Sequence, residues 1–216
     1  MGCIFDLDGV IVDTAKYHFQ AWKQLANDLG FDFSEADNEK LKGVSRAESL
    51  NLILGWGGVQ VSEAEKLHLM EKKNRVYLDL INEMNPSEIL PGVAEFLEHL
   101  TQNQIAIALG SASKNAEIIL EKVELKHYFQ VLIDGNKVSK SKPDPEVFLK
   151  GAEGLGLAPE NCIVFEDAEK GLEAAKAGGF YAIGVGDPAV LFEADYCIQN
   201  FEGQDIHDLF NKVKKA

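Results

Sequence analysis

The most informative part of the sequence is Cys3-Ile4-Phe5-Asp6-Leu7-Asp8-Gly9, a short apolar run that ends in two acidic residues and a glycine. Similar apolar runs end at Leu109, Phe165 and Val185, and each is followed by polar residues or glycine. Short runs that are apolar throughout predict strands buried on both faces of a sheet. Helical patterns separate them, which predicts right-handed crossovers and a parallel sheet. These patterns fall at 93–100, 116–123, 146–155 and 168–177.

A long helical segment interrupts this alternation directly after the first strand. Residues from about 14 to 84 show helical patterns and no strand pattern, and Pro and Gly then mark the return to the alternating pattern. We therefore predict an α/β protein with a Rossmann-like parallel-sheet core, formed by residues 1–13 and 87–216. A helical cap domain, residues 14–86, would be inserted after the first strand.

Composition excludes several classes of protein. The 216 residues carry a net charge of −14, from 21 basic and 35 acidic residues, whereas a nucleic-acid binder usually shows a basic excess. No apolar run approaches the roughly 20 residues of a membrane helix, and no secretory leader is apparent. Cys3, Cys162 and Cys197 lack the spacing of a disulfide framework, which suits a reducing compartment. We expect a cytoplasmic monomer that acts on a small molecule.

Carboxylates gather where the predicted strands end. Asp6 and Asp8 follow the first strand, and Glu166 and Asp167 follow another. Because sites in open parallel sheets form at the carboxyl ends of the strands, we expect these four side chains to converge. Four carboxylates would repel one another strongly in a dry site, and a hard divalent cation removes that repulsion. Mg2+ is the natural choice, since it takes oxygen ligands and tolerates a substrate phosphate.

Four motifs at these strand ends resemble those of the haloacid dehalogenase-like hydrolase superfamily. They are Phe5-Asp6-Leu7-Asp8-Gly9-Val10, Gly110-Ser111-Ala112-Ser113-Lys114, Ser141-Lys142-Pro143-Asp144-Pro145 and Glu166-Asp167. The helical insert after the first motif resembles the cap of that superfamily. A narrower set is similar to its β-phosphoglucomutase branch. This set comprises Leu41-Lys42-Gly43-Val44-Ser45-Arg46, with His18 and Trp22 upstream and Ser113-Lys114-Asn115 downstream.

The resemblance implies an enzyme that works through an aspartyl-phosphate. Asp6 would be the nucleophile, and Asp8 would be the general acid and base. Mg2+ would be held by the Asp6 carboxylate, the Asp8 backbone carbonyl and Asp167, with Glu166 nearby. Ala168 departs from the expected pattern, because Ser or another small polar residue usually follows the acidic pair. This departure leaves one hydrogen bond around the metal site open to question.

The resemblance also implies residues that bind phosphate and substrate. In the core they are Ser111, Ala112, Lys114, Asn115 and Lys142. In the cap they are His18, Trp22, Gly43, Ser45, Arg46 and Lys73. Arg46 would bind a second phosphate that does not react, which suits the fork geometry of guanidinium. Alternatives stay open for three of these residues. His18 could be a packed core residue, Lys73 could belong to a solvated helix face, and Arg46 could be a surface charge at a helix start.

The function that this resemblance implies is the interconversion of β-D-glucose 1-phosphate and glucose 6-phosphate through a bound 1,6-bisphosphate. One alternative is a magnesium-dependent sugar-phosphate phosphatase of the same superfamily. Another, of a different class, is a non-catalytic module that binds phosphosugars. This last alternative is disfavoured because every acidic position of the motifs is present.

Overall fold

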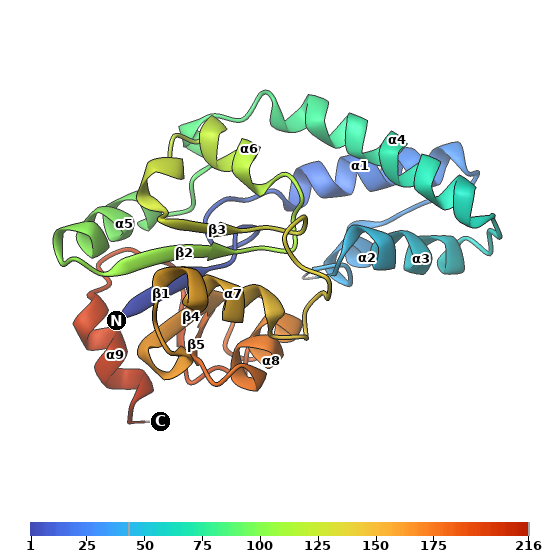
Figure 1. Ribbon diagram of the computed structural model, residues 1–216. Helices are drawn as coiled ribbons and strands as arrows, with labels where there is room; N and C mark the ends of the chain where they lie inside the picture. The colour runs from blue at the N-terminus through green and yellow to red at the C-terminus, as the bar shows by residue number, and fades with distance from the viewer. Residues whose placement is uncertain (43, 216) are drawn as a thin grey trace.

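The computed structural model describes residues 1–42 and 44–215, which contain a six-stranded parallel sheet in the order β3-β2-β1-β4-β5-β6 (Figure 1). The strands are β1 (Gly2–Phe5), β2 (Ala106–Gly110), β3 (Val131–Ile133), β4 (Cys162–Glu166), β5 (Tyr181–Val185) and β6 (Tyr196–Ile198). In the central register, Phe5 pairs with Leu109 on one side and with Phe165 on the other. The residues that follow these three positions therefore emerge at the same edge of the sheet.

Helices cover both faces of the sheet, which explains why its strands are apolar throughout. They are α5 (Val93–Gln102), α6 (Ala116–Lys122), α7 (Glu146–Leu155), α8 (Glu169–Ala177) and α9 (Ile206–Val213). Short 3-10 helices lie in the connecting segments, namely η1 (Pro86–Glu88), η2 (Lys126–Tyr128) and η3 (Pro159–Asn161). Phe5 packs in a core cluster with residues of α5, α6 and α9. Its neighbour Ile4 points to the opposite face and packs with residues of α7 and α8.

Among the described residues, four α-helices lie between β1 and α5 in the chain, beyond one edge of the sheet (Figure 1). They are α1 (Ala15–Asp28), α2 (Glu35–Glu39), α3 (Arg46–Trp56) and α4 (Glu63–Ile81). They have a hydrophobic cluster of their own, which includes Trp22, Leu50, Ile53 and Leu69. The predicted fold class, a parallel-sheet core with a helical cap inserted after the first strand, is confirmed. The exact domain bounds, 1–13 with 87–216 and 14–86, stay a prediction.

The two chain segments that join core and cap run side by side. Val12 and Ile89 form an antiparallel bridge, and the Leu90 amide donates to the Ile11 carbonyl at 3.0 Å. Glu88 accepts a hydrogen bond at 2.8 Å from the hydroxyl of Tyr17, in the first turn of α1. The start of the cap is thereby tied to the segment that returns to the core. Within residues 1–42 and 44–215, no helix is both long and apolar enough to cross a membrane.

Candidate active site

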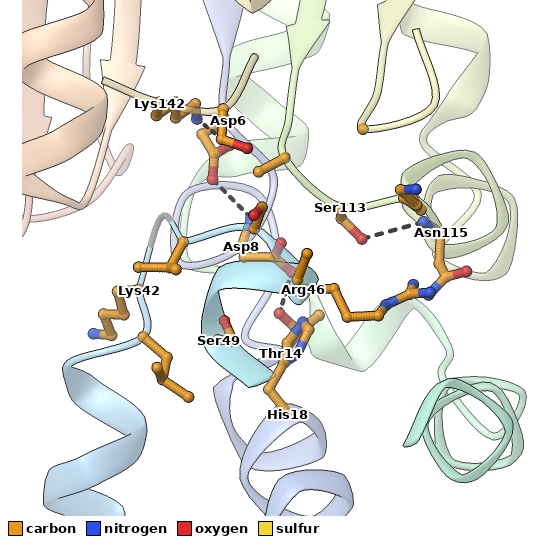
Figure 2. Close-up of a pocket in the computed structure, with 18 of the residues that line it drawn as sticks. Asp6, Asp8, Thr14, His18, Lys42, Arg46, Ser49, Ser113, Asn115 and Lys142 are labelled. Atoms are coloured by element: carbon orange, nitrogen blue, oxygen red, sulfur yellow. Dashed lines mark hydrogen bonds and ion pairs between the residues drawn. The ribbon is translucent and has the colours of Figure 1, made fainter. Parts of the chain in front are cut away.

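A cavity of about 520 Å³ lies between the carboxyl edge of the sheet and the cap (Figure 2). Its size is in the usual range for sites that bind small molecules. Most of the residues predicted from the sequence line it, namely Asp6, Asp8, His18, Trp22, Ser45, Arg46, Lys73, Ala112, Lys114, Asn115, Lys142 and Asp167. Ser111 and Glu166 are buried beside it and are not among its lining residues. Gly43 lies outside the residues that the structure describes.

Lys142 lies between two carboxylates at the floor of the cavity. Its Nζ is 2.7 Å from Asp6 Oδ1 and 2.5 Å from Glu166 Oε1, and it lies 4.7 Å from the centre of the Phe148 ring. Burial alone would lower the pKa of Lys142, but the two carboxylates outweigh it and raise that pKa. Lys142 therefore stays charged, and it supplies the local positive charge that an anionic substrate needs in so acidic a chain.

Three carboxylates gather where β1 and β4 end. Asp6, Glu166 and Asp167 each offer an oxygen, and these atoms lie within 4.8 Å of one another. Burial and the neighbouring carboxylates raise the pKa of Glu166 to about 7 and that of Asp167 well above its ordinary value. One lysine cannot neutralise all three groups. An all-oxygen, negatively charged set of donors fits a hard divalent cation such as Mg2+.

Two glycines allow the carboxylates of Asp167 and Glu166 to lie close to neighbouring backbone, at Gly9 and at Gly171. Gly9 adopts a φ of +82°, and a Cβ atom there would lie 2.1 Å from Asp167 Oδ2. A Cβ atom at Gly171, in α8, would lie 1.9 Å from Glu166 Oε1. A side chain at either position would displace a member of the acidic cluster, so both glycines are required for its geometry.

Asp8 occupies a different environment from the acidic cluster. The hydroxyl of Thr14 donates a hydrogen bond to Asp8 Oδ1, and the Asp8 amide donates to Asp6 Oδ2 at 3.2 Å. Burial, and then the charge of Asp6, raise the pKa of Asp8 to about 6. Both protonation states of Asp8 are therefore accessible near neutral pH, as a residue that gives and takes protons requires.

Thr14 is a site residue that the sequence analysis missed. It stands at the N-cap position of α1, where a threonine side chain usually accepts a hydrogen bond from the helix. In this structure it makes no such bond, and its hydroxyl contacts Asp8 instead. The sequence does not predict the contact with Asp8, because a Thr before a helix is also expected where it only caps that helix.

Lys73, which is buried, pairs with the half-buried His18 at the cap side of the cavity. Lys73 Nζ and His18 Nδ1 are hydrogen-bonded at 2.9 Å, and Nζ lies between the rings of Trp22 and Tyr77, 4.6 and 4.5 Å from their centres. Burial and neighbouring cations lower the pKa of both Lys73 and His18. The alternative of a solvated helix face is wrong for Lys73, whose exposed fraction is 2%.

Arg46 begins α3 and extends across the cavity toward Asn115, away from Asp6 and Lys142 (Figure 2). Ser45 caps this helix, since its hydroxyl accepts from the Glu48 amide at 3.4 Å. On the core side, the side chain of Asn115 donates to Asn74 Oδ1 of α4 at 3.0 Å. Cap and core therefore both contribute polar groups at this second end of the cavity.

Lys42 is a further residue absent from the predicted site. It lines the cavity, and its Nζ lies 3.9 Å from Asp167 Oδ2 across the cleft. Burial lowers its pKa, but contacts with Glu39 and Asp167 outweigh that effect and raise it. Its role could have been inferred from the sequence, because Lys42 lies within the run from Leu41 to Arg46 that carries the narrower resemblance.

A family model described as haloacid dehalogenase-like hydrolase matches residues 1–179. The chain belongs to this family. Haloacid dehalogenase-like phosphomutases and phosphatases generally use Mg2+, which agrees with the acidic cluster described above.

Similar proteins include both mutases and phosphatases. A β-phosphoglucomutase of Bacillus subtilis is 43% identical over 198 residues, covering 91% of this chain and 88% of that protein. A phosphorylated carbohydrates phosphatase of Thermotoga maritima is 35% identical, covering 83% and 82%. The crystal structure of a β-phosphoglucomutase from Clostridium difficile superposes with a TM-score of 0.95 at 40% identity, covering 99% of this chain and 97% of that chain.

Proposed function

We propose that this protein is a β-phosphoglucomutase. It would interconvert β-D-glucose 1-phosphate and glucose 6-phosphate through a bound 1,6-bisphosphate and an aspartyl-phosphate on Asp6. The observation that carries the proposal is a cavity with phosphate-binding chemistry at both ends. Lys142 lies beside Asp6 at one end, and Arg46 lies near Asn115 at the other (Figure 2). A substrate with two phosphates needs both ends, whereas the hydrolysis of one phosphate needs only the first.

The chemistry would begin at Asp6. Its carboxylate would attack the phosphorus of a bound phosphate in line with the leaving oxygen. Lys142, whose Nζ lies 2.7 Å from Asp6 Oδ1, would stabilise the negative charge on the phosphoryl oxygens. Mg2+ bound by Asp6, Asp167 and the Asp8 carbonyl, with Glu166 nearby, would supply further positive charge to the transferring group. The Ala112 amide and Ser111 would complete the binding of that group.

Asp8 would move the protons. It would protonate the leaving oxygen when the phosphoenzyme forms, and it would later deprotonate the sugar hydroxyl that accepts the phosphate. Its pKa of about 6 suits both steps. The Thr14 hydroxyl would hold Asp8 in place, because its hydrogen bond fixes Oδ1.

The cap would control whether water or a sugar hydroxyl reaches the phosphoenzyme. A mutase must exclude water and admit a sugar hydroxyl, and a closed cleft achieves both. Contacts already join cap and core, from Asn74 to Asn115 and from Lys42 to Asp167. The remaining predicted cap residues, His18, Trp22, Ser45 and Lys73, would shape the sugar pocket. A small sugar phosphate is thus the partner we propose, while the monomeric state and the cytoplasmic location stay predictions.

A sugar-phosphate phosphatase is the second candidate, favoured by the 35% identical relative that carries such a name. Phosphatase and mutase would share the Asp6 intermediate and differ in the group that attacks it. The test is an assay of the purified protein with Mg2+, β-D-glucose 1-phosphate and a trace of the bisphosphate. Glucose 6-phosphate should be the main product, and phosphate release without it would favour the phosphatase.

Arg46→Ala should raise the KM for glucose phosphates about tenfold or more. The reason is the loss of a charge-assisted contact with the distal phosphate, worth on the order of 1.5–3 kcal/mol. Steady-state kinetics would measure it, with Arg75→Ala as the matched control, because Arg75 is an exposed arginine of the cap outside the cavity. Kinetics of Arg46→Ala equal to those of the control would show that Arg46 does not bind substrate.

A further inference from the structure

The core wall of the cavity is formed by an irregular segment, residues 134–145, between β3 and α7. It contributes Gly135, Val138, Ser139, Lys140, Ser141 and Lys142 to the lining. A segment of this length without regular structure needs contacts of its own to keep one shape. Its first part is held by the neighbouring loop, since the Gly135 amide donates to the Ser113 carbonyl at 3.2 Å.

The side chain of Glu146, in the first turn of α7, holds the turn at Ser139 and Lys140 in the middle of this segment. Glu146 Oε2 accepts three hydrogen bonds, from the Ser139 amide at 2.9 Å, the Ser139 hydroxyl at 2.8 Å and the Lys140 amide at 2.8 Å. Its other oxygen lies 2.6 Å from Lys150 Nζ. The ammonium of Lys150 in turn donates to the Lys137 carbonyl at 2.7 Å.

Glu146 keeps its charge throughout the pH range in which the protein would work. The ion pair with Lys150, and then the hydrogen bond from Ser139, lower the pKa of Glu146 to about 2. Hydrogen bonds to an ionised acceptor are about twice as strong as neutral ones. Glu146 itself is not among the residues that line the cavity, so it acts only through the segment that it holds.

We propose that Glu146 is a positioning residue, which holds the turn at Ser139 and Lys140 so that residues 139–141 form the substrate-binding wall. Lys142, the next residue, has independent anchors in Asp6 and Glu166. Loss of Glu146 should therefore weaken substrate binding more than the chemical step. The kinetic part of this inference rests on the proposed function, because it assumes that a phosphosugar occupies the cavity.

The experiment compares Glu146→Ala with Glu153→Ala, an exposed residue of the same helix whose side chain makes no hydrogen bond or ion pair with the described residues. Amide hydrogen exchange of Ser139 and Lys140 should accelerate at least about tenfold in Glu146→Ala only. The KM for the phosphosugar should rise at least about fivefold, with kcat within about twofold of wild type. Glu146→Gln should lie between wild type and Glu146→Ala, because its amide oxygen still accepts hydrogen bonds without the charge.

Unchanged exchange at Ser139 and Lys140 in Glu146→Ala would overturn the proposal, and so would faster exchange with an unchanged KM. If Glu146→Ala does not fold, Glu146→Gln decides: exchange and KM both raised at least about twofold support the proposal, and wild-type values overturn it. The KM can be taken from sugar-phosphate hydrolysis if the protein proves to be a phosphatase. If no phosphosugar is turned over at all, the exchange rates decide by themselves whether Glu146 holds the segment.

Discussion

Asp6→Asn should lower turnover to less than about a thousandth of the wild-type rate, for isomerisation and for phosphate release alike. Asparagine keeps the size of the side chain but removes the anionic oxygen that would attack phosphorus. Loss of a covalent route should raise the barrier by at least about 4 kcal/mol, equivalent to three decades in rate. Initial rates with β-D-glucose 1-phosphate would measure it, and removal of Mg2+ by a chelator should have a comparable effect.

The matched control is Asp32→Asn, at an exposed aspartate of the cap that lies outside the cavity. It should keep wild-type kinetics. Mass spectrometry must show that the asparagine introduced in the Asp6→Asn variant has not deamidated, because a small fraction of aspartate would restore measurable activity. If the intact Asp6→Asn protein retained more than about a thousandth of the rate, an aspartyl-phosphate at this position would be contradicted.

Lys142→Met should abolish most activity and also destabilise the protein in a pH-dependent way. The side chain of Lys142 is 1% exposed and pairs with Asp6 and Glu166. Removal of one partner from a buried ion pair costs about 3–5 kcal/mol, because the remaining charges lose their compensation. Turnover should fall at least about a hundredfold, since the positive charge beside Asp6 is lost.

The sign of the pH dependence follows from the carboxylates that remain. Even with Lys142 present, burial and then Asp6 outweigh the lysine and raise the pKa of Glu166 from 4.5 to about 7. The folded protein therefore binds more protons than the unfolded chain between these pH values, so this group costs stability as pH rises. Without Lys142, which lowers the pKa of Glu166, that pKa should rise further, so the stability lost as pH rises becomes larger. Compared with wild type, Lys142→Met should lose more stability at pH 8 than at pH 5.5.

Thermal unfolding at both pH values, with and without Mg2+, would measure this difference. Mg2+ should recover part of the stability at pH 8, because it binds the folded acidic cluster and not the unfolded chain. Lys170→Met is the control, since Lys170 is exposed and its side chain makes no hydrogen bond or ion pair with the described residues. An equal loss of stability at pH 5.5 and pH 8 would contradict the proposed electrostatic role of Lys142.

The sequence predicted the central strands because they are buried on both faces. β1, β2, β4 and β5 each consist of four or five residues that are nearly all apolar. β3 and β6 were not predicted, because each has only three residues and most of these are partly exposed. In the cap, α2 is only five residues long, too short for a recognisable helical period.

The convergence of Asp6, Glu166 and Asp167 could be predicted because it follows from topology. Residues after neighbouring parallel strands must meet at one edge of the sheet. The position of Lys73 could not be predicted in this way. Its partner His18 lies 55 residues away, and only the packing of α1 against α4 buries the lysine between two aromatic rings. The contact of Thr14 with Asp8 likewise depends on how the chain turns after β1.

The fate of the phosphoenzyme tests the proposed mutase activity most directly. The protein would be phosphorylated with labelled glucose 1,6-bisphosphate, and unlabelled β-D-glucose 1-phosphate would be added in a single turnover. Transfer of label to sugar should exceed its release as inorganic phosphate by at least about tenfold, equivalent to about 1.4 kcal/mol of preference for the sugar hydroxyl over water. Predominant release of inorganic phosphate with every hexose phosphate tried would contradict the mutase assignment and leave a phosphatase that uses Asp6.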